Sequence, residues 1–154
     1  MDARPNTPEA LLARYAELID AGDFDGIGAL FADAAITDAS GALVARGRAA
    51  VSSLYQSTTR RFEDGTPKTK HITTNTIVEN SDDGLTARAR SYFVVLQQVQ
   101  DGPIEPIAAG RYHDKLVRLD NGWQFTERQM LPEMFGDVSQ HLLFDASKLA
   151  NPQE

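Results

Sequence analysis

The chain has 154 residues, which is the length of one domain, and 42% of them are hydrophobic, enough for a core and too many for wholesale disorder. It contains no cysteine, so disulfides, thiolate metal sites and thiol nucleophiles are excluded, and this composition fits a reducing cytoplasm. The net charge of −7 would repel a phosphate backbone, so we expect no nucleic-acid partner.

No segment has the pattern of a membrane anchor or of a cofactor site. The N-terminal MDARPNTPEA has no apolar stretch, and no run of about 18 apolar residues occurs, so we expect neither a signal peptide nor a transmembrane helix. The histidines His71, His113 and His141 do not have the spacing of a metal motif, and no glycine-rich phosphate loop is present. We therefore predict a cytoplasmic protein without a metal or cofactor.

The first half of the chain has helical patterns. A helix is predicted between Thr7, a capping residue followed by proline, and Gly22, a residue typical of the position just beyond a helix end. A shorter helix follows Asp23, a short hairpin is predicted over 35–45, and a third helix is predicted over 48–62. Apolar residues recur in these helices at intervals of three and four, so each helix is expected to bury one side.

The second half has strand patterns. Long strands are predicted over 70–80, 85–100 and 104–119, followed by a shorter one over 123–128, with tight turns between them. The segment 130–149 is predicted to contain a short amphipathic helix.

Helices followed by long antiparallel strands predict an α+β fold in a single domain. We place this domain over residues 1–154, with its core over about 8–130 and a C-terminal tail over 131–154. Strands of about 14 residues are expected to curve and to leave a hollow at one end of the sheet. An apolar patch on the outer sheet face predicts a homodimer through that face; the patch consists of Tyr92, Val94 and Leu96.

Four segments occur in an order that resembles the SnoaL-like branch of the nuclear transport factor 2-like superfamily. They are RYAELIDAGDFDGIGALFAD at 14–33, TKHITTN at 69–75, GRYHDKLVR at 110–118 and GWQFTER at 122–128. The resemblance implies a cone in which the N-terminal helices pack in a strongly curved, mixed, mainly antiparallel sheet that encloses a ligand pocket. The superfamily includes dehydratases, isomerases, polyketide cyclases, dioxygenase β subunits and non-catalytic proteins, so this fold does not fix the function.

The resemblance also implies a catalytic pair. Scytalone dehydratase-like members carry an acid at the end of the first helix and a histidine at the start of a strand, and Asp20 and His71 occupy the matching positions. In such a pair the carboxylate orients the imidazole, which then moves a proton. From the residues alone, a solvated Asp20 and a partly exposed His71 are equally good interpretations.

Further residues are assigned to the substrate pocket. The same comparison implies a pocket wall formed by Asp38, Asn75, Tyr112 and Asp114, and Val95 stands where such dehydratases have a second histidine. Tyr15 belongs either to the pocket or to the core. A buried Asp114 would require a partner, for which Arg128 is a candidate. His113 is predicted to lie at the surface or in an interface, and His141 at the surface.

These assignments lead to two alternative functions for a pocket that binds a hydrophobic, oxygenated small molecule. The first is a cofactor-independent lyase or isomerase, of the dehydratase or cyclase type, that uses Asp20 and His71 for proton transfer. The second is a non-catalytic protein that binds a ligand or a partner, such as an accessory subunit. The absence of the second strand histidine favours the second alternative.

Overall fold

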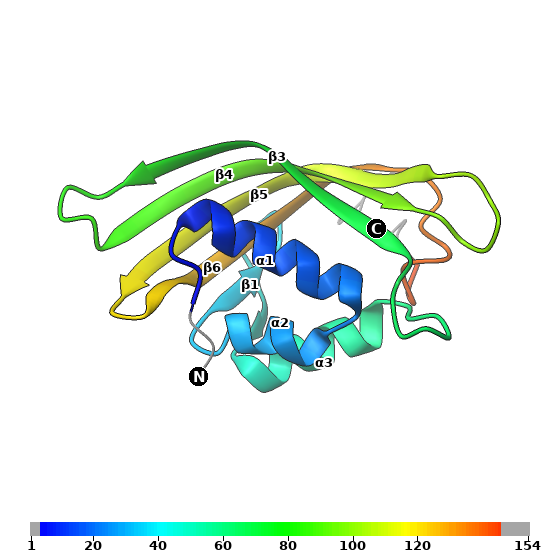
Figure 1. Ribbon diagram of the computed structural model, residues 1–154, viewed down its shortest axis with the longest axis horizontal. Coiled ribbons are helices and arrows are strands. Elements are labelled where there is room, and N and C mark those ends of the chain that lie inside the picture. The colour runs from blue at the N-terminus through cyan, green and yellow to red at the C-terminus, as the bar shows by residue number, and fades with distance from the viewer. Residues whose placement is uncertain (1–3, 146–154) are drawn as a thin grey trace.

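The computed structural model describes residues 4–145, in which three helices precede the four long strands of a six-stranded sheet (Figure 1). The elements in chain order are α1 (Pro8–Ala21), α2 (Phe24–Leu30), β1 (Ala35–Thr37), β2 (Leu43–Arg46), α3 (Arg48–Thr58), β3 (Thr69–Asn80), β4 (Thr86–Gln97), β5 (Glu105–Leu119) and β6 (Gly122–Phe135). The α+β class is thereby confirmed. Within the described residues, none of the helices has the length and apolar character needed to cross a membrane.

Helix α1 begins and ends at the predicted residues. The Thr7 side chain accepts a hydrogen bond from the Ala10 amide at 3.1 Å, and Pro8 occupies the first turn. Gly22 ends the helix with φ 72°, and a Cβ at this position would lie 2.0 Å from the Gly65 carbonyl oxygen. Only glycine satisfies both the left-handed backbone and this close approach. The chain therefore turns sharply at Gly22 and leaves Asp20 in the last turn of α1.

The sheet is mixed and curved, as predicted. Its strand order is β2-β1-β6-β5-β4-β3, in which β1 and β6 run parallel and all other neighbours are antiparallel. All three helices lie on the concave side, and the sheet does not close (Figure 1). Strand β3 is consequently an edge strand, and it faces α1 along its first half.

The core fills the space between the helices and the concave face. The Phe31 ring stacks on that of Phe125 at 4.9 Å, and both side chains are fully buried. Burying one such ring stabilises a fold by about 1.5–3 kcal/mol. On β4 the alternation is clear, because Phe93 and Val95 are buried while Tyr92 between Ser91 and Phe93 is exposed. This packing fixes which side chains of β3 and β4 face inward.

Two predicted boundaries and one predicted element are wrong. Helix α3 ends at Thr58 and does not extend to residue 62. The last strand extends to Phe135, well beyond residue 128, because its second half pairs with the first half of β5. Residues 136–145 form turns and an isolated bridge between Thr59 and Leu142, with no helix among them; the rest of the predicted helical segment, 146–149, lies outside the described residues.

Candidate functional site

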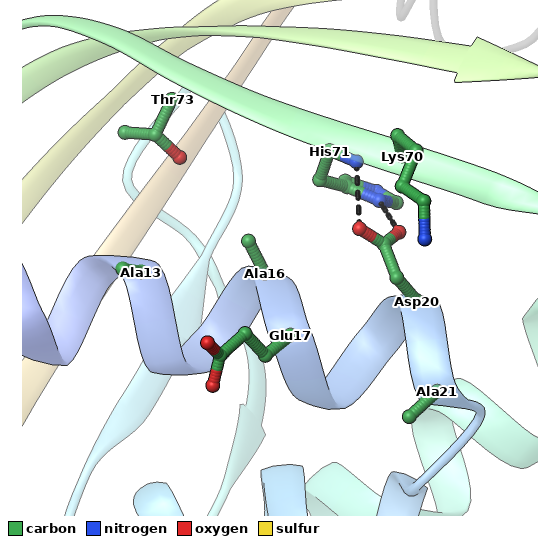
Figure 2. A pocket seen from close by; sticks show the side chains of 8 residues that line it. All are labelled: Ala13, Ala16, Glu17, Asp20, Ala21, Lys70, His71 and Thr73. Carbon is green, nitrogen blue, oxygen red and sulfur yellow. Dashed lines mark hydrogen bonds and ion pairs between the residues drawn. The ribbon is translucent and has the colours of Figure 1, made fainter.

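Asp20 and His71 are in direct contact at the junction of α1 and β3 (Figure 2). The His71 ring nitrogen Nδ1 lies 2.6 Å from Asp20 Oδ1, and the His71 backbone amide donates to Oδ2 at 2.8 Å. The Thr69 hydroxyl donates to Oδ1 at 2.8 Å. The side chains are 12% exposed for Asp20 and 7% for His71, so the pair is largely shielded from water.

These donors explain why a carboxylate is stable in the last turn of a helix. The helix dipole disfavours a negative charge there by about 0.3–1 kcal/mol. Three hydrogen bonds converge on the two oxygens of Asp20 and outweigh that cost. Thr69 and His71 can both reach it because residues two apart on a strand face the same side.

The contact sets the charge of Asp20 and the tautomer of His71. Burial alone would raise the pKa of Asp20, but the hydrogen bonds and charge of His71, with Thr69, outweigh burial and hold that pKa below its usual range. Asp20 is therefore ionised at neutral pH and can only accept hydrogen bonds. Nδ1 of a neutral His71 must then carry the hydrogen, which leaves Nε2 as the basic nitrogen.

A groove of about 490 Å³ runs between α1 and β3 beside this pair (Figure 2). Its lining residues are Ala13, Ala16, Glu17, Asp20, Ala21, Lys70, His71 and Thr73. The volume falls in the range of small-molecule sites. The alanines give it a smooth apolar wall, while Glu17 and Lys70 place opposite charges at its rim. The groove opens along the edge of the sheet and is not enclosed within its curve.

The interior of the curved sheet is occupied by a buried ion pair stacked with aromatic rings. Arg128 donates to Asp114 through Nε at 2.8 Å and Nη2 at 3.0 Å, and both side chains are 0% exposed. The Arg128 guanidinium lies 3.8 Å from the ring centre of Tyr112 and 4.3 Å from that of Tyr15. The hydroxyls of Tyr15 and Tyr55 are hydrogen-bonded to each other. The aromatic rings and the ion pair hold one another in place, because either charge of the pair would be costly to bury without its partner.

The predicted pocket residues divide into two groups. Tyr15, Val95, Tyr112 and Asp114 are buried in the interior, and none of them lines the groove. Val95 is nevertheless the strand partner of His71, and the proposed partner of Asp114, Arg128, is confirmed.

Asp38 and Asn75, which were predicted for the pocket wall, lie away from the groove. Asp38 is exposed in the turn between β1 and β2, where its carboxylate accepts hydrogen bonds from Ser40 and Ala42. Asn75 is exposed where the β3–β4 register shifts, and its φ of 53° marks a local bulge. Neither side chain lines the groove.

Thr69 and His141 were missed by the sequence reasoning. The position of Thr69, two residues before His71 in a strand, was an available signal. His141 was predicted at the surface, which is wrong: it is 7% exposed, and its ring centre lies 6.1 Å from that of His71. No local pattern reveals this contact, because the segment is held by long-range bonds such as that from Gln97 Nε2 to the Gln140 carbonyl at 3.1 Å. His113 is exposed at the surface.

Among residues 4–145, no three His, Asp or Glu side chains are grouped so that they could hold a metal ion. The contact between His71 and Asp20 provides an imidazole held by a carboxylate, and such a pair can transfer protons.

Residues 9–129 match the family model of the SnoaL-like domain. A variant of Rv3472, a protein of unknown function from Mycobacterium tuberculosis, is similar in structure with TM-score 0.65 and 27% identity, over 82% of this chain and 74% of that one. A nuclear transport factor 2-like protein with a cystatin-like fold from Novosphingobium aromaticivorans has TM-score 0.62 and 26% identity, over 77% and 75%. A proposed scytalone dehydratase from the same organism has TM-score 0.64 and 22% identity, over 84% and 83%, and so shows the fold alone. No curated protein matches the sequence.

Proposed function

The chain belongs to the SnoaL-like domain family, and from this premise and the Asp20–His71 contact we propose that it is a cofactor-independent lyase or isomerase. The substrate would be a hydrophobic small molecule that carries a carbonyl or hydroxyl group. The observation that supports this proposal is the 2.6 Å contact between His71 Nδ1 and an ionised Asp20 beside the groove.

The proposed reaction uses His71 Nε2 as the general base. It takes a proton from a carbon next to the substrate carbonyl, and the electron pair of the broken C–H bond forms an enolate. The resulting imidazolium is stabilised by the Asp20 carboxylate at Nδ1. The imidazolium then returns the proton, either to a β-hydroxyl that leaves as water or to another carbon of the same molecule. Proton transfer by a positioned group of this type contributes about 10²–10⁴-fold in rate.

The groove indicates the substrate class. Ala13, Ala16 and Ala21 offer apolar contact without side-chain bulk, so a flat ring system would fit against α1. Thr73 and Lys70 add a hydroxyl and an ammonium group on the side of β3, and these groups can bind a substrate oxygen. This distribution favours an aromatic or polycyclic molecule with oxygen at one edge.

A non-catalytic role as a ligand-binding or partner-binding protein is the second candidate. The observation that favours it is the closed interior, where Tyr112 and Asp114 are committed to Arg128 and its aromatic neighbours and not to a pocket. In this case the groove would bind a ligand without converting it.

Water loss from aromatic β-hydroxy ketones, followed by mass spectrometry, distinguishes these candidates. The enzyme proposal expects conversion of at least one such ketone by the unmodified chain and by His113→Phe, with loss of conversion in His71→Phe. Binding of a ketone at the groove without conversion, or unchanged conversion in His71→Phe, would support the second candidate.

We also propose that the outer sheet face binds a second copy of the chain. Strand register aligns Ile72, Val94, Ala109 and Met134 in one row across β3, β4, β5 and β6. Tyr92 and Met134 are 51% and 67% exposed, which is costly for large apolar side chains in a single copy. The Arg111–Glu133 ion pair beside the row supplies both signs of charge to a symmetric contact.

A further inference from the structure

His141 lies beside His71 although the two residues are 70 positions apart in sequence (141 − 71). The segment that carries it is fixed at several points. The Arg60 amide donates to the His141 carbonyl at 2.8 Å, the Leu143 amide donates to the Thr58 carbonyl at 2.9 Å, and Gln97 Nε2 donates to the Gln140 carbonyl at 3.1 Å. The His141 ring is therefore held in place from both sides of the residue.

The His141 ring has an unused hydrogen-bonding atom. Its Nδ1 is buried and has no hydrogen-bond partner among residues 4–145. Leaving a buried nitrogen unpaired is costly, so such an atom is normally satisfied by water or by a ligand. The described residues around it do not supply that partner.

The distance between the two rings suits one bridging oxygen. At 6.1 Å between centres and a tilt of 57°, the rings are too far apart for a direct N–H···N bond, which requires about 2.9 Å between nitrogens. A single oxygen placed between them can lie at hydrogen-bond distance from a nitrogen of each ring. His71 cannot use Nδ1 for this purpose, because Asp20 occupies it. The nitrogen that His71 would offer is Nε2.

We infer that His71 and His141 hold one ligand oxygen between them, and that His141 is a second ligand-contacting histidine supplied by the C-terminal segment. The inference rests on the proposed function, since it assigns the β-hydroxyl oxygen of the proposed substrate to this position, where the hydroxyl donates to Nε2 of neutral His71. His141 donates a hydrogen bond from Nδ1 to that oxygen, and no bond to His141 forms or breaks during the reaction.

The electrostatics of the site agree with this role. Burial, reinforced by the neighbouring His71 and partly opposed by Asp20, lowers the pKa of His141 to about 4. His141 is therefore uncharged at neutral pH. An uncharged donor can hold this hydroxyl while it leaves as water, without placing a second positive charge beside the His71 imidazolium.

The test uses 2-naphthol, an aromatic ring system with one hydroxyl, and the ring-nitrogen NMR signals of the full ¹⁵N-labelled chain. Saturable addition of 2-naphthol is expected to shift a nitrogen of His71 and a nitrogen of His141 with the same Kd. A shift of His71 alone would overturn the inference and leave the proposed function standing. Absence of a saturable shift at either ring would overturn the inference together with the proposed substrate class.

A variant pair adds a second readout. His141→Phe keeps an aromatic ring at this position and removes the donor, so 2-naphthol affinity is expected to fall about tenfold. His113→Phe, which changes an exposed histidine on the outer face, is expected to bind as the unmodified chain does. Because His141→Phe removes a buried nitrogen that has no partner, we expect this variant to melt no lower than the unmodified chain. Unchanged 2-naphthol affinity in a folded His141→Phe variant would show a purely structural role and overturn the inference.

Discussion

His71 binds Asp20 twice, through its ring Nδ1 at 2.6 Å and through its own backbone amide at 2.8 Å. The backbone bond does not depend on the side chain at position 71. Replacing the imidazole therefore leaves the carboxylate oriented by that amide and by Thr69. Loss of function in a His71 variant can then be separated from loss of structure, which makes the pair unusually suitable for mutational tests.

Asp20→Asn is expected to lower turnover by about 10²–10⁴-fold without unfolding the chain. An asparagine amide can donate to Nδ1, which favours the tautomer with the hydrogen on Nε2 and removes the basic lone pair facing the ligand. Ring-nitrogen NMR at neutral pH checks the tautomer, and the β-hydroxy ketone assay checks the rate. Glu9→Gln, which removes an exposed acid from the same helix, is the control. An unaltered His71 tautomer in Asp20→Asn would contradict this explanation.

Stability is expected to fall between pH 6.5 and about pH 4 because of His141. In the unfolded chain its pKa is near 6.5, whereas burial, with His71 opposed by Asp20, lowers the folded pKa to about 4. Over this interval the unfolded state binds the proton and the folded state does not, so stability is lost as the pH falls. The loss from this group amounts to about 3 kcal/mol at pH 4.

Urea unfolding at pH 7 and pH 4 measures this effect. His141→Phe lacks the titrating ring, so its free energy of unfolding should decrease by about 3 kcal/mol less than that of the unmodified chain. Asp20 also destabilises the fold as the pH falls, but at lower pH. Because its pKa is lower in the folded chain than in the unfolded chain, its contribution to stability is complete above the unfolded-state pKa and is lost as the pH falls through the folded-state pKa. Equal pH dependence in the two proteins would mean that His141 is accessible to protons in the folded state.

Breaking the buried Arg128–Asp114 ion pair is expected to cost much stability, and removing the second charge is expected to restore most of it. Arg128→Met leaves Asp114 charged and unpaired at 0% exposure, and we expect a loss of about 3–5 kcal/mol in the free energy of unfolding. Adding Asp114→Leu should recover most of it, because no buried charge remains. Chemical denaturation of the single and double variants measures both the loss and the recovery of the free energy of unfolding. A double variant no more stable than Arg128→Met would contradict the ion-pair explanation.

The proposed dimer predicts a change of assembly without a change of fold. Tyr92→Glu places a charge on the outer face beside the apolar row, and we expect it to halve the mass measured by light scattering. Leu119→Glu changes another exposed apolar residue, which lies at the end of β5 and outside the row, and should leave the mass unchanged. A monomer mass for the unmodified chain would reject the dimer directly.

The fold could be predicted to the extent that local periodicity determined it. The predicted outer-face position of Tyr92 is confirmed by its exposure, and Thr7 and Gly22 marked the ends of α1. The extension of the last strand to Phe135 could not be predicted, because it depends on pairing with residues near Ala108, far away in sequence. Residues that depend on long-range pairing carry no local pattern of their own.

The site residues, like the fold, could be predicted only in part from the sequence. The pairing of Asp20 and His71 was predicted from the family resemblance, and the structure places the two side chains in contact. Asp38 lies away from the groove because its carboxylate accepts hydrogen bonds from the amides of its own turn, as acids in turns often do. His141 was missed because its burial depends on where residues 136–145 are held against α3 and β4.

In the proposed reaction, the Asp20-held imidazole of His71 removes a proton from the carbon next to a carbonyl. The most direct test of this step is exchange of the α-hydrogens of 2-tetralone in deuterium oxide, followed by ¹H NMR, with the unmodified chain, His71→Phe and the His113→Phe control. We expect accelerated exchange by the unmodified chain and by the control, and exchange at the buffer rate with His71→Phe. Equal acceleration by the unmodified chain and His71→Phe would contradict the proposed reaction.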